Sequence, residues 1–279
     1  MDNRQSAAIA RFRTLHESGC FVIPNPWDVG SAVYLRHLGF KALATTSAGF
    51  AFTRAMPDAA IPIDLVLGHV REIAEATDLP VNADFQDGYA IEPEGVAANV
   101  SLCIGTGAAG LSIEDSTGDP SKPLYDEKLA IERVKAARQT IDASGIPVIL
   151  TARCEAWLVG HKDAQAIARD RLAAFADAGA DCLYAPSVRT IGEIAALVKI
   201  VAPKPVNALV SAPGPDWTVS KLADAGVRRI SVGSAFARAA WGGFIRAAKS
   251  ISETGSFEAL GDAAPFAELN GIFGKSTDQ

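Results

Sequence analysis

Short apolar runs and longer amphipathic stretches alternate along this chain from about residue 20 to residue 232. The runs are rich in Val, Ile and Leu and end abruptly in polar residues, as strands do when both faces of a parallel sheet are covered. The stretches between them have the spacing of amphipathic helices. Strands are therefore expected at residues 20–24, 41–46, 80–84, 110–114, 147–153, 181–185, 205–209 and 228–232.

A helix is expected before each strand and after the last one. The expected helices cover residues 4–18, 30–38, 64–76, 93–105, 127–143, 164–178, 191–201 and 218–225, and the chain from 235 onward. Asp64 is the expected N-cap of the helix at 64–76. A glycine that can adopt the left-handed conformation ends a helix just before a strand at four places, Gly39, Gly107, Gly179 and Gly226.

Eight such units in about 240 residues predict a (β/α)8 TIM barrel, an α/β fold, rather than an open doubly wound sheet. The first strand is not followed by a GxGxxG sequence, which disfavours a dinucleotide-binding fold. We expect a single domain over residues 1–279, in which residues 241–279 form a C-terminal helical arm.

Composition narrows the class of protein. The net charge of −6 and the absence of a Lys/Arg run argue against a nucleic-acid partner. The four cysteines are scattered without a CxxC pair, so they are interpreted as reduced packing residues of a cytoplasmic protein. The N-terminal stretch lacks a long apolar segment, and neither a secretory signal nor a membrane span is expected.

Carboxylates end two of the apolar runs, at Asp84 and Glu114. Functional groups of such barrels lie at the C-terminal ends of the strands, where neighbouring ends converge. Two acids there, with water and substrate, suit Mg²⁺, although each could instead be a salt-bridged rim residue. Asp87 lies in a DGY turn, and alternation points Asp115 away from Glu114, so both are weaker candidates.

Arg153 ends another apolar run, where it either binds a substrate carboxylate or is held by Glu155. Ser47, Ala48 and Gly49 follow the second strand. Their backbone N–H groups and the hydroxyl make either a nest for a carboxylate or phosphonate, or a plain tight turn.

Other polar groups fall at the same rim. Asn207 ends the seventh strand, and Asp58 lies in a long loop where it either reaches the site or starts a turn. The four histidines fall in or just after predicted helices, which disfavours histidine catalysis, and there is no GxSxG elbow. The loop at 115–126 is long and rich in Gly, Pro and Ser, as mobile lids are, and Lys122 is its only cation.

Taken in order, these motifs resemble the isocitrate lyase/phosphoenolpyruvate mutase family over about residues 20–240. TTSAGFA is similar to its carboxylate-binding turn, and Pro57-Asp58 to its loop aspartate. NADFQDGYA resembles its metal-binding DAD-x-GYG stretch, and IED followed by TARCEA its metal-associated glutamate and substrate-binding arginine. The resemblance implies a Mg²⁺-dependent barrel acting on enolates of α-oxo acids. It also implies homo-oligomers, dimers or tetramers, that exchange a C-terminal helix, for which the segment after Trp241 is the candidate.

Two departures from the family pattern matter. Asn82 stands where the family has its first aspartate, so a neutral amide, which can still ligate a metal or bind its water, lowers the charge of the site. The lid lacks the KKCGH-type sequence of isocitrate and methylisocitrate lyases and the asparagine sequence of phosphonate-handling members. Neither activity therefore transfers directly.

The favoured interpretation is a Mg²⁺-dependent carbon–carbon lyase that acts on a small α-oxo or α-hydroxy acid. A mutase or hydrolase that breaks a P–C bond, and a non-catalytic oxo-acid-binding protein, are the alternatives. The residues assigned are Asp84, Glu114 and Asn82 for the metal, Ser47, Ala48, Gly49, Arg153 and Asn207 for substrate, and Arg153, Asp58 and Glu114 for catalysis.

Overall fold

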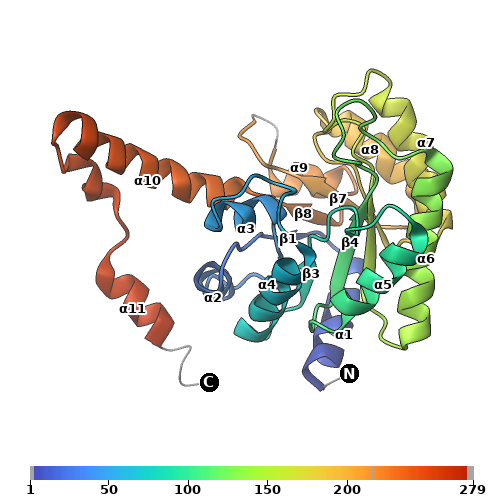
Figure 1. The fold of residues 1–279 in the computed structure, drawn as a ribbon, viewed down its shortest axis with the longest axis horizontal. Helices are drawn as coiled ribbons and strands as arrows, with labels where there is room; N and C mark the ends of the chain where they lie inside the picture. Colours follow the sequence, from blue (N-terminus) through green and yellow to red (C-terminus); the bar gives the residue numbers. More distant parts are fainter. Residues whose placement is uncertain (1–2, 215–216, 275–279) are drawn as a thin grey trace.

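Eight parallel strands form a ring in the computed structural model, which describes residues 3–214 and 217–274 (Figure 1). Their order is β1-β8-β7-β6-β5-β4-β3-β2. At the remaining seam, the backbone N–H of Ala44 donates to the carbonyl of Pro24 at 3.0 Å. The strands are β1 Phe21–Ile23, β2 Leu43–Ala44, β3 Val81–Ala83, β4 Gly110–Glu114, β5 Ile149–Arg153, β6 Cys182–Tyr184, β7 Val206–Leu209 and β8 Arg229–Ser231. The predicted (β/α)8 barrel is confirmed.

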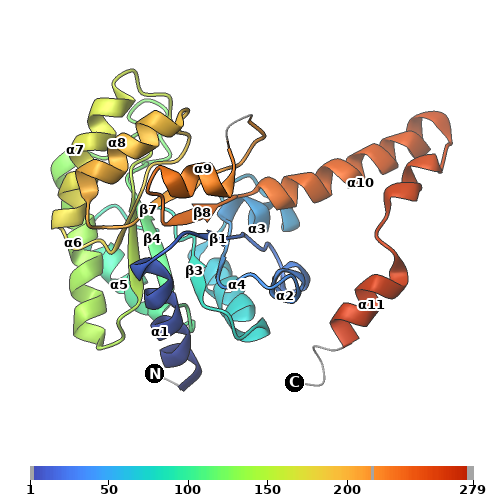
Figure 2. The same cartoon turned by 180° about the vertical axis from the view of Figure 1, so that it is seen from behind.

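Helices surround the ring and follow the chain in the expected alternation (Figure 2). They are α1 Asn3–Glu17, α2 Val29–His37, α3 Ser47–Thr53, α4 Ile63–Ala76, α5 Pro93–Ile104, α6 Glu127–Ser144, α7 Ala164–Asp177, α8 Ile191–Val201, α9 Val219–Asp224, α10 Ala235–Thr254, the 3₁₀ helix η1 Glu258–Asp262 and α11 Phe266–Gly274. The assignment of Asp64 as an N-cap is wrong, because α4 begins one residue earlier, after Pro62, and Asp64 lies in its first turn.

The short helix α3 was not expected. The hydroxyl of Thr46 accepts a hydrogen bond from the Gly49 amide and caps the helix, so the small residues after β2 coil instead of forming an open turn. The four glycines expected to end helices all have positive φ, as predicted. A side chain is disfavoured at Gly179 for two reasons. Its φ is positive, and a Cβ at this position would lie 2.6 Å from the Arg138 side chain.

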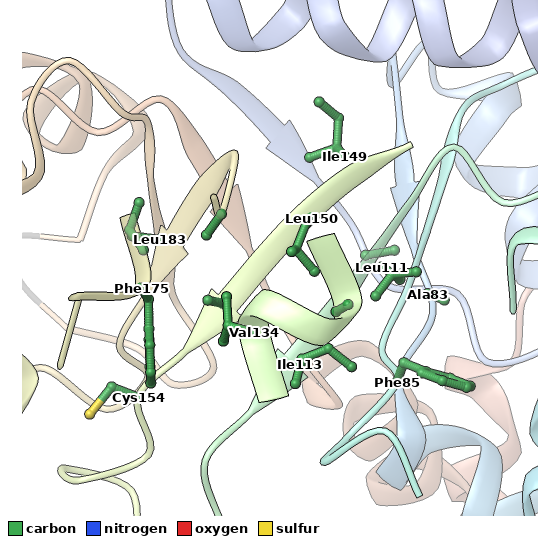
Figure 3. Close-up of a cluster of buried hydrophobic side chains, with 14 of the residues drawn as sticks. Ala83, Phe85, Leu111, Ile113, Val134, Ile149, Leu150, Cys154, Phe175 and Leu183 are labelled. Carbon is green, nitrogen blue, oxygen red and sulfur yellow. The ribbon is translucent and has the colours of Figure 1, made fainter. Parts of the chain in front are cut away.

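The hydrophobic core lies between the outer surface of the ring and the helices. Leu111 and Ile113 of β4 and Leu150 of β5 point outward and gather near Val134 of α6 (Figure 3). The alternate residues of the same strands, such as Ser112 and Thr151, point into the ring and are polar. On these two strands, polar side chains therefore face the ring interior.

Helix α1 closes the N-terminal mouth of the ring. Phe12 is fully buried, and a Cβ on Gly110 at the start of β4 would lie 2.8 Å from its ring. His16, one turn further along, approaches Arg229 of β8, with 3.3 Å between its Nε2 and Nη1. The interior is therefore blocked at this end.

The C-terminal helices leave the barrel. Helix α10 extends away from the ring, and α11 returns beside α2, where the Tyr34 hydroxyl donates to Glu268 at 3.4 Å (Figures 1 and 2). Phe244, Phe257 and Phe266 are largely exposed on this arm. Within residues 3–214 and 217–274, no helix combines the length and the apolar character that a membrane crossing requires.

Candidate active site

A cavity of about 360 Å³ opens at the C-terminal ends of the strands. All of the predicted site residues except Gly49 line it, namely Ser47, Ala48, Asp58, Asn82, Asp84, Glu114, Arg153 and Asn207. Gly49 is buried beside it, against Thr46, Trp27 and Ala237. The fold therefore brings residues from five separate βα units to one place.

Arg153 is the centre of this cavity. Its Nη1 lies 2.8 Å from Asp84 Oδ1, its Nη2 3.0 Å from Glu114 Oε2, and its Nε 2.9 Å from Glu155 Oε1. Its guanidinium carbon also lies 4.8 Å from the centre of the Tyr184 ring. These contacts use three of the five N–H groups of the guanidinium, so two remain for a ligand.

Three carboxyl groups surround the single positive charge of Arg153. Burial raises the pKa of Glu114 well above its usual range; Arg153 opposes this, and the negative charges of Glu155 and Asp84 add to it. Burial also raises the pKa of Asp58, and the charge of Asp84 raises it further. Such shifts mark a site with surplus negative charge, which a cation would relieve.

Some backbone N–H groups of the turn after β2 already donate hydrogen bonds to other protein groups. The Ser47 amide donates to Asp84 Oδ2 at 2.9 Å, and the Gly49 amide donates to Thr46 Oγ1 at 3.3 Å. The Ser47 hydroxyl acts on Asp58 and lowers the pKa of its carboxyl, against the larger effect of burial. Ala48 contributes the backbone of this turn that lines the cavity.

Asn82 lies one layer below Asp84 on the inner face of β3. Its amide nitrogen donates to the Ala83 carbonyl at 3.1 Å, while its Oδ1 is buried without a hydrogen-bond partner. An orphaned carbonyl oxygen in a polar cavity is a suitable ligand for a hard cation or its water.

Charged residues near the lid have structural contacts. Asp115 accepts from the Glu155 amide at 2.7 Å and from Arg171 Nη1 at 2.7 Å, while Arg171 Nη2 donates to the Tyr125 carbonyl at 2.8 Å. This buried pair ties together the two ends of the loop 115–126. Lys122 is exposed and pairs with Asp126 instead of lining the cavity.

In the floor of the cavity, the predicted Asn207 contacts two residues that the sequence interpretation did not assign to the site, Arg229 and Ser231. Asn207 Nδ2 donates to Ser231 Oγ at 2.9 Å, and Arg229 Nε donates to Asn207 Oδ1 at 2.8 Å. Arg229 and Ser231 alternate along β8 and so share the inner face. The alternation of Arg229 and Ser231 was visible in the sequence. Two polar residues in a short strand do not, however, indicate which side chains on other strands they contact.

Carboxylates from several strand ends around one arginine, in a barrel of this kind, define a (β/α)8-barrel enzyme that binds an organic anion. The chain belongs to the phosphoenolpyruvate phosphomutase family, whose model matches residues 12–252. This confirms the family resemblance of its motifs.

Relatives cover the chain to different extents. An uncharacterized protein of Mycobacterium tuberculosis is 34% identical over 269 residues, which is 92% of this chain and 94% of that protein. The 2-methylisocitrate lyase of Escherichia coli is 30% identical over 58% of this chain and 55% of its own length. An oxaloacetate decarboxylase of Rhodopseudomonas palustris is 33% identical over 50% of this chain and 49% of its own. The named relatives are lyases, and this chain is an enzyme of their family.

Solved structures match over nearly the whole chain. A Burkholderia cenocepacia protein assigned only broadly, as a lyase or mutase, has a TM-score of 0.94 and 43% identity, covering 98% of both chains. Oxaloacetate acetylhydrolase in complex with its product oxalate has a TM-score of 0.86 and 26% identity, covering 99% of this chain and 97% of its own. Phosphonopyruvate hydrolase, solved with oxalate and Mg²⁺, shares the fold at 23% identity, with a TM-score of 0.82 and coverage of 100% and 97%.

Proposed function

We propose that this chain is a Mg²⁺-dependent lyase that cleaves a carbon–carbon bond of a small α-oxo or α-hydroxy carboxylic acid through an enolate. The single observation that carries the proposal is the arrangement around Arg153, where one guanidinium with two uncommitted N–H groups faces an excess of carboxylates in a small polar cavity. Decarboxylation and retro-aldol cleavage are the reactions that this arrangement suits best.

The donor set fits a hard cation. Asp84 and Glu114 lie on either side of the Arg153 guanidinium, and the unpartnered Oδ1 of Asn82 lies below them. Across the described ranges 3–214 and 217–274, no three acidic, histidine or cysteine side chains converge closely enough to hold a metal alone. Water and substrate oxygens would thus complete the coordination shell. Bound there, Mg²⁺ would supply Lewis-acid stabilisation of negative charge on the substrate's oxo oxygen.

The chain's own residues would bind and orient the acid. The two remaining N–H groups of Arg153 suit an anionic oxygen of the substrate, and the Ser47 hydroxyl and Ala48 backbone would hold its carboxylate. Asp58, which lines the same cavity as Ser47, would position that hydroxyl. The volume of about 360 Å³ suits a small acid rather than a large cofactor.

The loop after β4 supports this choice among family reactions. It contains no cysteine between 115 and 126, so it offers no thiol acid for isocitrate-type cleavage. A decarboxylase among the relatives and an oxalate-binding acetylhydrolase among the structures act, by their names, on a four-carbon oxo acid. A compact oxo diacid is therefore the first substrate class to test.

The test is release of a shorter oxo acid, such as pyruvate, from a panel of two- to six-carbon oxo and hydroxy acids. Turnover is expected with Mg²⁺ and should be lost when the metal is chelated and restored when it is returned. Turnover that persists after complete chelation would contradict the proposal.

The family name favours one alternative, cleavage or rearrangement of a P–C bond. Phosphorus NMR of phosphonopyruvate with the enzyme and Mg²⁺ separates P–C bond chemistry from carbon–carbon cleavage. Only P–C bond chemistry predicts a new phosphorus signal. Tight oxo-acid binding by calorimetry, with no turnover of any panel member, would instead indicate a binding protein.

A further inference from the structure

A buried cation without an acidic partner lies at the floor of the cavity. Arg229 is 3% exposed, and its described hydrogen bonds go to neutral groups only. They join Nε to Asn207 Oδ1 at 2.8 Å, Nη2 to Thr151 Oγ1 at 2.9 Å and Nη1 to His16 Nε2 at 3.3 Å. A guanidinium can only donate, so it fixes the direction of every hydrogen bond that leads away from it.

The hydrogen bonds that lead away from Arg229 continue to the wall of the cavity. Because Arg229 holds the oxygen of the Asn207 amide, the amide nitrogen faces Ser231 and donates to its Oγ at 2.9 Å. The Ser231 hydroxyl in turn acts on the Tyr184 phenol and lowers its pKa, against the larger effect of burial. A chain of polar groups therefore runs from Arg229 through Asn207 to Ser231, and both Ser231 and Tyr184 line the cavity.

Tyr184 is the group on which Ser231 acts, and it lines the cavity. Its ring lies against the guanidinium of Arg153, and the charges of Glu155 and Asp84 act on it. Burial raises the pKa of this phenol to about 12, so it keeps its proton at neutral pH. Its side chain lines the cavity, and none of the described residues accepts a hydrogen bond from its hydroxyl, so this O–H is available to a ligand.

Other neutral proton donors are scarce in this cavity. Its described lining includes no histidine, cysteine or lysine, and Tyr184 is its one phenol. Burial also raises the pKa values of Glu114 and Glu155, but both carboxyl groups are engaged with the Arg153 guanidinium, whereas the Tyr184 hydroxyl is not. Tyr184 is thus the side chain whose chemistry and hydrogen bonding both suit donation of a proton.

We propose that Tyr184 is the catalytic acid that protonates the enolate carbon, and that Asn207 and Arg229 are positioning residues that direct its hydroxyl. This inference rests on the proposed lyase function. The carbon–carbon bond breaks and its electron pair passes into the enolate. The enolate carbon then takes the proton of the Tyr184 O–H, so a C–H bond forms and a phenolate remains. The Ser231 hydroxyl and the Arg153 charge stabilise that phenolate until water reprotonates it.

The test compares the wild type with Tyr184→Phe, which keeps the ring against Arg153 and removes only the hydroxyl. The panel acids are supplied with Mg²⁺ in D₂O, including 3-methyl members whose product gains a chiral CHD carbon. The wild type should deliver deuterium to one face. Tyr184→Phe should lower kcat by about 100-fold or more, the usual contribution of a positioned acid, leave KM nearly unchanged and give a racemic product.

Ser231→Ala should lower kcat by only about fivefold, since it removes one polar group that acts on the acid. Tyr34→Phe, a surface tyrosine on α2, should behave as the wild type. Oxalate binding measured by calorimetry should be the same in Tyr184→Phe and the wild type, which checks that the variant site is intact.

The outcomes separate the two proposals. If the wild type releases no oxo acid from any panel member, the proposed function itself fails. If the wild type is active and Tyr184→Phe keeps its rate, or loses rate but still deuterates one face, Tyr184 is not the acid while the lyase function stands.

Discussion

Asp84 and Arg153 are joined across the mouth of the ring, with 2.8 Å between Oδ1 and Nη1, although 69 residues separate them in the chain. Asp84 directly follows β3 and Arg153 ends β5, and Glu114 ends the strand β4 that lies between these two. The arginine therefore leans across its neighbouring strand, and acids on three strand ends or the loops after them fix its orientation. An organic anion would meet a guanidinium that is already ordered.

Replacing Asp84 by Asn should weaken Mg²⁺ binding by about tenfold or more, because it removes one of two charged oxygens near Asn82. Calorimetric titration of the metal-free protein with Mg²⁺ measures this directly. Asp119→Asn in the exposed tip of the loop 115–126 is the matched control and should bind as the wild type does. Equal affinities for both variants would show that the metal does not bind at Asp84.

Breaking the buried pair between Asp115 and Arg171 should be costly. Asp115→Asn leaves a buried guanidinium without its counter-charge, which typically costs about 3–5 kcal/mol of unfolding free energy. Lys122→Gln, which breaks the exposed pair with Asp126, should change it by less than about 1 kcal/mol. Denaturant unfolding compares the two, and a similar small loss in both would refute a structural role for the buried pair.

Stability should depend on pH through His16. Burial, and then the charge of Arg229, lower the pKa of this imidazole from 6.5 to about 3. As pH falls below 6.5, the unfolded chain gains a proton that the folded chain refuses, so this contribution to stability is lost towards pH 3.

The loss approaches about 1.4 kcal/mol for each pH unit inside that window. His16→Gln should therefore show a shallower decline of unfolding free energy than the wild type between pH 6.5 and 4. His37→Gln, at an exposed position on α2, should follow the wild type. Identical slopes for all three proteins would mean that His16 is protonated in the folded state.

The C-terminal arm, predicted as residues 241–279, is proposed to carry the subunit interface; its last five residues lie outside the described part. Phe244, Phe257 and Phe266 are 61%, 66% and 82% exposed, and exposed apolar side chains gathered on one arm indicate a protein partner. Sedimentation should show a dimer or tetramer for the wild type and smaller species for a Phe244→Glu, Phe266→Glu double variant. Glu253→Gln on α10, the helix that carries Phe244, is the control and should keep the wild-type assembly. A monomeric wild type would refute the proposal.

The sequence predicted those features that depend on repeated local patterns. Each strand ended within about two residues of its expected position, and β4 was correct at both ends, because buried parallel strands are continuous apolar runs. Helix α3 was missed since its stability comes from a cap, Thr46, and from packing of Gly49 against Trp27, neither of which has a periodic signal.

Within the site, the sequence predicted which residues lie at the rim, but it did not predict most of the contacts between their side chains. Asp84, Glu114 and Arg153 were expected at one rim because strand ends converge. The engagement of Arg153 by three acids at once depends on side-chain directions set by the twist of the ring. Asn207 was expected at this rim, but its partners Arg229 and Ser231 in the floor were missed for the same reason.

The seal that α1 places under the ring has a kinetic consequence. Because Phe12 fills the lower mouth among the described residues, the acid and both fragments of the proposed cleavage would use the mouth at the C-terminal ends of the strands. Two products that share one exit would leave one after the other. Product release, rather than bond breaking, would then limit the rate of the proposed reaction.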